Sequence, residues 1–99
     1  MPNYRSESID RLFRAFMTLD NLEDCYAFFD DICTISELQD MAQRLDTAVM
    51  LDEGMNYQTI SQQVGVSTAT ISRVSKCLNY GSGGYRDALD KLYRSQEKK

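Results

Sequence analysis

Apolar side chains recur along the first half of the chain at the three- and four-residue spacing of an α-helix. The pattern predicts one helix over about 6–19, a second over about 21–32, and a third that opens at Thr34 and reaches about Asp52. Thr34 and Glu37 have the spacing of a capping box, and Gly54 follows the end of the third helix. No segment alternates apolar and polar residues as a strand does, so we expect an all-α fold.

The apolar stripes of these three helices are wide. In the first helix, for example, one face carries Ile9, Leu12, Phe13, Phe16 and Met17. Stripes of this width indicate burial against one another and against a second chain, with a compact monomeric bundle as the alternative. A chain of 99 residues has room for one domain with a modest core, which a partner subunit would help to stabilise.

Two further helices are predicted between Asn56 and Leu78, joined by a very short turn. Asn56 can cap a helix that ends at Gly65, and Ser67 can cap the next helix only two residues later. So short a link forces the two helices to cross at a large angle, and glycine suits the left-handed backbone of the turn. The apolar anchors of the second helix are Ile71, Val74 and Leu78.

The opposite face of that second helix is polar and has no acidic side chain. It consists of Thr68, Ala69, Thr70, Ser72, Arg73 and Lys76. A recognition helix enters the major groove of DNA by its N-terminal end, where small side chains allow close approach and free N–H groups favour phosphate. The pattern therefore predicts a helix-turn-helix that binds DNA. A hairpin with a purely structural role is the alternative, but it would be free to expose Asp or Glu on this face.

Charge is unevenly distributed, which changes the meaning of the formal net charge of −4. Residues 1–66 carry four basic and twelve acidic side chains, whereas residues 67–99 carry seven basic and three acidic ones. No Asp or Glu occurs between Met55 and Tyr80. A surface that approaches phosphates must exclude carboxylates, so this distribution favours nucleic-acid binding by the later part of the chain.

Composition argues against several other functions. The chain has no histidine and its three cysteines form no Cys-x-x-Cys pair, so we predict neither a metal site nor an enzyme. The glycine-rich run at 81–84 lacks the order of a phosphate-binding loop and is predicted to be a flexible connection. No apolar run approaches the ~18–20 residues that span a bilayer, and the N-terminus lacks the pattern of a signal peptide. We expect a cytoplasmic protein with no membrane partner.

The segment 65–74 resembles the helix-turn-helix of many bacterial repressors. More than fifty residues of helix precede it and one short helix follows, an order similar to that of the Trp repressor superfamily and closest to its YerC/YecD branch. The resemblance runs from about Phe16 to Leu92. It implies six helices and an intertwined homodimer, with two recognition helices about one DNA turn apart. The implied function is that of a sequence-specific transcription regulator, a repressor, with a protein-interaction module as the alternative.

We therefore predict one helical DNA-binding domain over 1–99. Its parts are dimerisation helices over 1–53, the helix-turn-helix over 55–79, the glycine-rich connection over 80–84 and a C-terminal helix over 85–96. The partners expected are double-stranded DNA and a second copy of the chain.

The resemblance also assigns residues to two sites. Gln58 and Ser61 would face DNA with the second helix, which gives the DNA-binding candidates Gln58, Ser61, Ser67, Thr68, Ala69, Thr70, Ser72, Arg73 and Lys76. At the place where Trp repressor holds its corepressor, the effector-pocket candidates are Thr34, Arg44, Arg73, Val74 and Cys77. For Arg44 and Arg73, a position on the surface or facing phosphate is the alternative. Val74 stands where Trp repressor has a glycine beside the indole, and Cys77 where it has a serine. We therefore expect no cofactor, and any small-molecule corepressor to be other than tryptophan.

Overall fold

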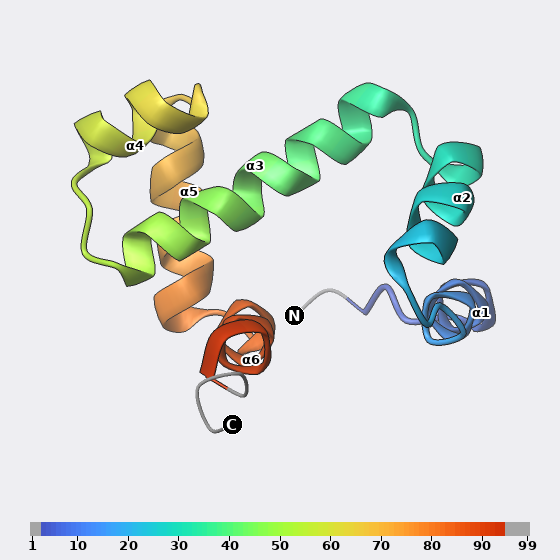
Figure 1. The fold of residues 1–99 in the computed structure, drawn as a ribbon. Coiled ribbons are helices and arrows are strands. Elements are labelled where there is room, and N and C mark those ends of the chain that lie inside the picture. Colours follow the sequence, from blue (N-terminus) through green and yellow to red (C-terminus); the bar gives the residue numbers. More distant parts are fainter. Residues whose placement is uncertain (1–2, 95–99) are drawn as a thin grey trace. The chain divides into compact units, whose positions relative to one another are not determined.

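A computed structural model describes residues 3–94 and shows the chain as a series of helices (Figure 1). The helices are α1 (Glu7–Phe16), α2 (Leu22–Ile32), α3 (Ile35–Asp52), α4 (Tyr57–Val64), α5 (Thr68–Tyr80) and α6 (Gly84–Leu89), followed by a short π-helical segment, Asp90–Arg94. No strand occurs between residues 3 and 94. The prediction of an all-α fold with about six helices is confirmed.

Polar side chains cap the helices where the sequence places them. At the start of α3 the Thr34 hydroxyl accepts a hydrogen bond from the Glu37 N–H (3.1 Å), and the Glu37 carboxylate accepts one from the Thr34 N–H (2.9 Å). Hydrogen bonding to Thr34 lowers the pKa of the Glu37 carboxyl, and the backbone of Thr34 has a larger effect than its side chain. Asn21 caps α2 by accepting a bond from the Asp24 N–H at 2.8 Å. The predicted capping box is confirmed.

Two predicted helix ends differ from the structure. The first helix ends at Phe16 rather than at about residue 19, because the chain continues there as a tighter helical turn. The N–H groups of Thr18 and Leu19 each bond the carbonyl three residues earlier (both 3.1 Å), which is the spacing of a 3₁₀ turn. At the other end, α6 gives way after Leu89 to the π-helical segment. Residues 95–96 of the predicted last helix lie outside the described residues.

The chain divides into two compact units with a boundary between Leu38 and Gln39, so that α3 crosses from one to the other. In the second unit α3, α5 and α6 meet around a small core, and Figure 1 shows α5 crossing α3. The buried members of this core are Ala48, Val74, Leu78 and Leu89, flanked by the half-buried Leu45, Val49, Leu51 and Tyr85. The predicted anchors of α5 are confirmed as buried. The predicted subdivision at residue 53 stays a prediction.

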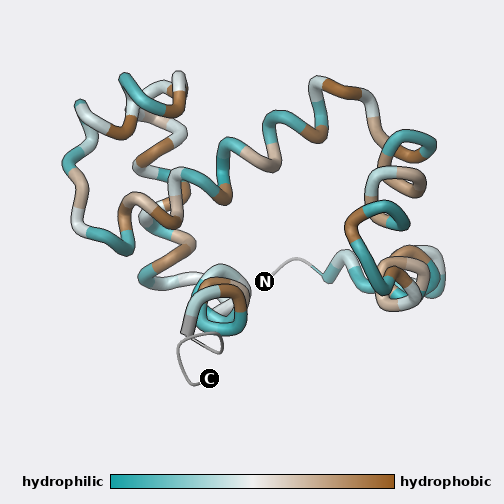
Figure 2. Tube along the Cα trace, viewed as in Figure 1, coloured by the Kyte–Doolittle hydropathy of each residue, from teal (hydrophilic) through white to brown (hydrophobic). Residues whose placement is uncertain are grey.

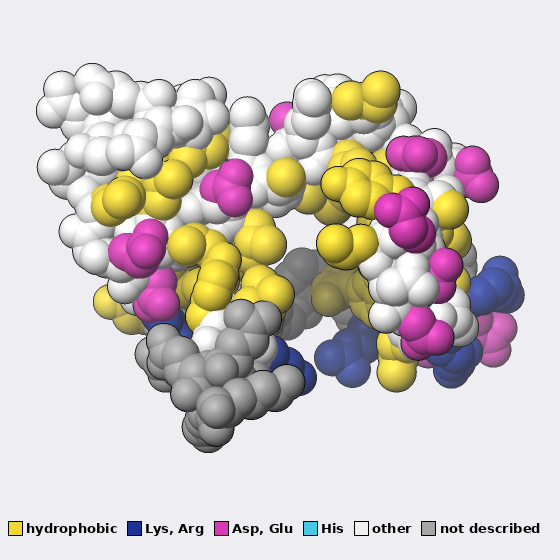
Figure 3. Space-filling model, viewed as in Figure 1, with side chains coloured by type: hydrophobic (Ala, Val, Ile, Leu, Met, Phe, Trp, Pro, Cys, Tyr) yellow, Lys and Arg dark blue, Asp and Glu magenta, His cyan; other side chains and the backbone are white. Residues whose placement is uncertain are grey.

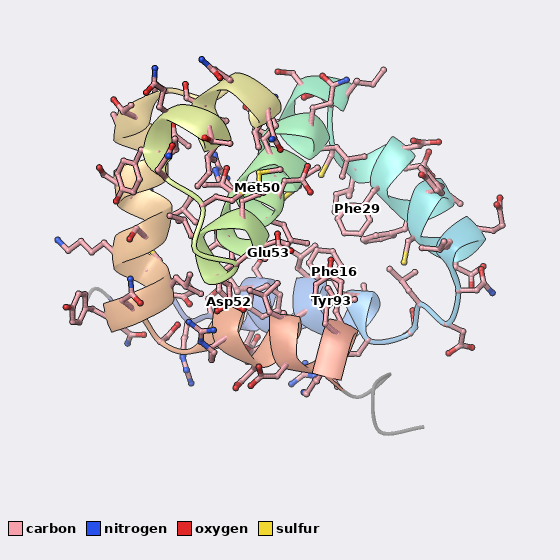
Figure 4. The ribbon with its side chains drawn as sticks, turned by 60° about the vertical axis from the view of Figure 1, so that its left-hand side comes forward. Phe16, Phe29, Met50, Asp52, Glu53 and Tyr93 are labelled. Atoms are coloured by element: carbon pink, nitrogen blue, oxygen red, sulfur yellow. The ribbon has the colours of Figure 1, made fainter. Side chains whose placement is uncertain are left out.

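The first unit has a different character. The Phe16 ring of α1 lies against the Phe28 and Phe29 rings of α2, with centroids 5.6 and 5.2 Å apart, and Figure 4 labels two of these rings. No side chain of α1 or α2 is fully buried, and Met17 and Leu22 are 82% and 75% exposed. Figure 2 shows apolar positions recurring along both helices. Within this unit of a single chain, the predicted apolar stripes are therefore only partly covered.

Candidate nucleic-acid interface

The turn between α4 and α5 is built by glycine and two capping side chains. Gly65 ends α4 with φ 85° and ψ 28°, and its N–H bonds the Ser61 carbonyl at 2.9 Å. Asn56 caps α4 by accepting from the Thr59 N–H (2.8 Å), and Ser67 caps α5 by accepting from the Thr70 N–H (3.2 Å). These caps and the left-handed glycine confirm the helix-turn-helix geometry expected from the sequence.

Apolar packing and one hydrogen bond hold the two helices together. Ile60 of α4 and Ile71 of α5 are both completely buried, while Val66 in the turn is half-buried. The Ser61 hydroxyl donates to the Val66 carbonyl at 2.7 Å, a bond that ties α4 to the turn. The orientation of α5 relative to α4 is thus fixed by side chains inside the motif itself.

We define the DNA face as the exposed side of α5 together with the start of α4. Seven of the nine predicted DNA-binding residues are exposed: Gln58, Ser67, Thr68, Ala69, Ser72, Arg73 and Lys76. The other two, Ser61 and Thr70, are half-buried, and both form hydrogen bonds within the protein. Ser61 donates to the Val66 carbonyl, and the Thr70 hydroxyl lies 3.2 Å from the Ser67 hydroxyl. Which of the nine contact DNA stays a prediction.

Two further exposed residues lie near the end of α5 and were not among the predicted candidates. Asn79 and Tyr80 stand seven residues, about two turns, after Ser72 and Arg73, so they continue the DNA face along the helix. The Tyr80 side chain is 87% exposed, and the Asn79 amide donates to the Ser75 carbonyl at 3.0 Å. Extending the helical spacing to the last turn of α5 would have found both residues from the sequence.

The electrostatics of α4 and α5 differ from those of the other helices. The first turns of α1, α2, α3 and α6 each contain an acidic residue, whereas those of α4 and α5 contain none. The positive ends of the α4 and α5 dipoles are therefore not neutralised by their own side chains, which favours an external anion. In the view of Figure 3, the region over α4 is uncharged and no acidic side chain interrupts it.

A pocket of about 260 Å³ lies beside the DNA face, within the second unit. Its lining comes from three helices and consists of Arg44, Thr70, Arg73, Val74, Cys77 and Tyr85. Four of the five predicted effector-pocket residues are thus brought together. The fifth, Thr34, is not part of the lining and instead caps α3. Thr70 and Tyr85 were not predicted for the pocket, because their place in it depends on how α5 and α6 pack against α3.

The lining of this pocket has two cationic groups and no carboxylate. Neither Arg44 nor Arg73 forms an ion pair with any described residue, whereas Arg86 on α6 pairs with Asp52 at the end of α3. Burial raises the pKa of the Tyr85 phenol, and the Cys77 thiol adds to this, while the two pocket arginines oppose it. Tyr85 therefore stays protonated at neutral pH and keeps its hydroxyl as a hydrogen-bond donor.

Two other kinds of feature are absent from residues 3–94. No group of three or more acidic, cysteine or histidine side chains could hold a metal ion there. None of the helices in that range combines the length and the apolar composition needed to cross a membrane. Cys25, Cys33 and Cys77 are free thiols.

Comparison with known proteins gives consistent matches over most of the chain. The model of the family described as Trp repressor protein matches residues 7–93. The uncharacterized protein YerC of Bacillus subtilis (strain 168) is 51% identical over 92 residues, which cover 93% of this chain and 88% of that protein.

Two crystal structures are similar in both fold and sequence. One, of a candidate Trp repressor from Staphylococcus aureus, has a TM-score of 0.85 and 49% identity, covering 89% of this chain and 88% of its own. The other, of a TrpR-like protein from Eubacterium eligens ATCC 27750, has a TM-score of 0.86 and 42% identity, covering 89% of this chain and 91% of its own.

Proposed function

This chain belongs to the Trp repressor family, as its sequence predicts, and from that premise we propose that it is a sequence-specific transcription regulator that acts as a dimer. The proposed direction of regulation is repression. The proposed site of action is the cytoplasm. The partners are then double-stranded DNA and a second copy of the chain.

The observation that carries this proposal is the exposed, carboxylate-free DNA face. Its side chains at the start of α5 are small, with Thr68 and Ala69 both exposed, so the backbone there can approach the edges of bases. Arg73 and Lys76 follow one and two turns later and can donate to phosphates. A surface with these properties suits the major groove, and a surface for an arbitrary protein partner needs none of them.

The dimer is supported by the apolar surface that the first unit leaves uncovered. A single recognition helix reads too few bases for useful specificity, so two copies related by a two-fold axis are expected to bind half-sites ~34–36 Å apart. Selection of bound sequences from random duplex DNA should therefore return inverted repeats with that spacing. A stable monomer in sedimentation at micromolar concentration would contradict the dimer.

The selected sequence allows a direct test of the DNA face. Ala69→Glu places a carboxylate at the exposed start of α5, where it would meet phosphates and the acceptor atoms of guanine. We expect DNA affinity to fall by at least about 1–3 kcal/mol, the cost of one damaged base contact, with no change in melting temperature. Gln39→Glu is the matched control, since it adds the same charge on an exposed position of α3, outside the DNA face. Equal DNA binding by Ala69→Glu and wild type would show that the face is wrongly assigned.

The alternative function, a protein-interaction module, predicts a different response to salt. If Arg73 and Lys76 of both copies each contact one phosphate, log K should fall against log salt with a slope of about −3.6. The alternative function, a protein-interaction module, would be favoured if DNA affinity did not depend on salt concentration. It would also be favoured if selection from random duplex DNA returned no preferred sequence.

A further inference from the structure

We propose that Asp52 and Arg86 are positioning residues for DNA binding. Their ion pair ties α6 to the end of α3 and, through α6, holds α5 in the orientation that presents the DNA face. The proposal rests on the proposed DNA-binding function and adds two residues to it. Both lie outside the DNA face, one on α3 and one on α6.

The pair lies where the helix-turn-helix joins the rest of the second unit. Asp52 is the last residue of α3, just before the connection to α4, and Arg86 is the third residue of α6, just after the connection from α5. Each connection contains a left-handed glycine, Gly54 with φ 86° and Gly83 with φ 94°, and an added Cβ at either would meet no atom within 4 Å. Packing therefore does not hold these two points, and a bond across both connections limits how far they can move apart.

The position of α6 is passed to α5 through the core. Leu89 of α6 is 3% exposed and belongs to the same cluster as Ala48 of α3 and Val74 and Leu78 of α5. Val74 and Leu78 lie on the buried side of the helix that carries the DNA face on its other side. A shift of α6 along α3 would therefore displace α5, because close-packed side chains transmit such strain.

The chemistry of the pair suits positioning better than global stabilisation. The side chains of Arg86 and Asp52 are 37% and 36% exposed, so water screens their attraction and the pair adds little to the stability of the fold. Asp90, one turn after Arg86, also attracts its guanidinium. A weak bond is sufficient to bias an arrangement, because DNA affinity is multiplied by the fraction of protein that is ready to bind. An exposed pair can change that fraction by up to about fivefold in each copy of the proposed dimer.

The first test uses the sign of the effect on DNA affinity. Asp52→Asn removes an acid, which by charge alone should strengthen binding to a duplex selected as above. A positioning role instead predicts binding weaker by at least about threefold. Glu53→Gln is the matched control, because it removes the same charge from the next residue, which is exposed and has no ion pair within the described residues. Figure 4 labels both acids near the end of α3. Stronger binding by both variants would overturn the proposal.

The second test is a double-mutant cycle on DNA affinity. Arg86→Gln should also weaken binding, and Asp52→Asn combined with Arg86→Gln should bind no more weakly than Arg86→Gln alone, because the pair can be lost only once. The product of the two single losses should exceed the loss of the double variant by at least about threefold. A product equal to the loss of the double variant would show that the two residues act independently, and the proposal would be wrong.

Hydrogen exchange without DNA separates failure of the pair from failure of the proposed function. The Asp87 N–H bonds the Gly83 carbonyl at 2.9 Å at the start of α6. Asp52→Asn should speed exchange of this and other α6 amides, and Glu53→Gln should not. Unchanged exchange in Asp52→Asn would mean that the pair does not hold α6, which overturns the proposal. Failure of the proposed function is recognised differently, since the wild type itself would then bind no duplex, and that result would refute this proposal as well.

Discussion

Gly65 ends α4 in a left-handed conformation, and replacing it with alanine should lower the stability of the protein by a single mechanism. Its φ of 85° lies in the left-handed region, which costs an L-residue with a Cβ roughly 1–2 kcal/mol. A Cβ built at this position meets no other atom within 4 Å, so no clash adds to that cost. The lower entropy of the unfolded alanine chain offsets about 0.4–1 kcal/mol. We expect Gly65→Ala to destabilise the protein by about 1 kcal/mol.

Three other glycines provide controls for this prediction. Gly54 has nearly the same φ, 86°, and equally open space, so Gly54→Ala should cost the same amount. Gly84 has open space and no left-handed φ, so Gly84→Ala should cost nothing. At Gly81 an added Cβ would stand 2.3 Å from the Cys77 carbonyl oxygen, and Gly81→Ala should cost more than Gly65→Ala.

Thermal and urea denaturation at one fixed protein concentration measure these differences, since the melting temperature of the proposed dimer would depend on concentration. For a domain of this size, 1 kcal/mol corresponds to a shift of about 4–8 °C. If Gly65→Ala and Gly84→Ala have the same melting temperature, the left-handed conformation of the turn is not what constrains residue 65.

Two further predictions concern pH and the effector. The capping box lowers the pKa of Glu37, so the ionised carboxylate stabilises the folded protein. This stabilisation should be complete above the ordinary carboxyl pKa of 4.5 and be lost as the pH falls below it. The melting temperatures of wild type and Glu37→Ala should therefore converge in acid and differ at neutral pH. L-tryptophan should raise DNA affinity by no more than a few-fold, because Val74 fills the position that the family resemblance places against the indole and overpacking costs ~1–3 kcal/mol. Micromolar binding in calorimetry together with a tenfold gain in a gel shift would refute the second prediction.

The features predicted correctly from the sequence are those fixed by residues close together in the chain. The Ser67 cap bonds an N–H three residues away, and the Gly65 turn needs only its own backbone conformation. The buried side of α5 follows from helical spacing, since Ile71, Val74 and Leu78 recur at three and four residues. Local rules of this kind need no knowledge of the partner helix.

Features that depend on packing between distant segments were not predictable in the same way. The ion pair of Asp52 and Arg86 joins residues 34 positions apart, and no spacing rule links them. Tyr85 follows the ordinary apolar spacing of a short helix, and this spacing does not distinguish it as a pocket residue. Its place in the pocket depends on how α6 packs. The resemblance to a known family supplied Arg44 for the same pocket, since the sequence around this residue gives no indication of the site.

The charge distribution bears on how a chain with a net charge of −4 can bind DNA. In the proposed complex, side chains on α5 would contact the phosphates, whereas the twelve acidic residues of 1–66 lie on other helices and loops. At physiological salt, exposed charges more than ~8 Å apart are largely screened, so any acid that lies farther than this from bound DNA opposes binding only weakly. At low salt the same acids repel DNA over longer distances and disfavour approaches that do not present α5. The acidic part of the chain should therefore disfavour complexes in which another surface of the chain meets the phosphates, and it should affect the contact made by the DNA face less.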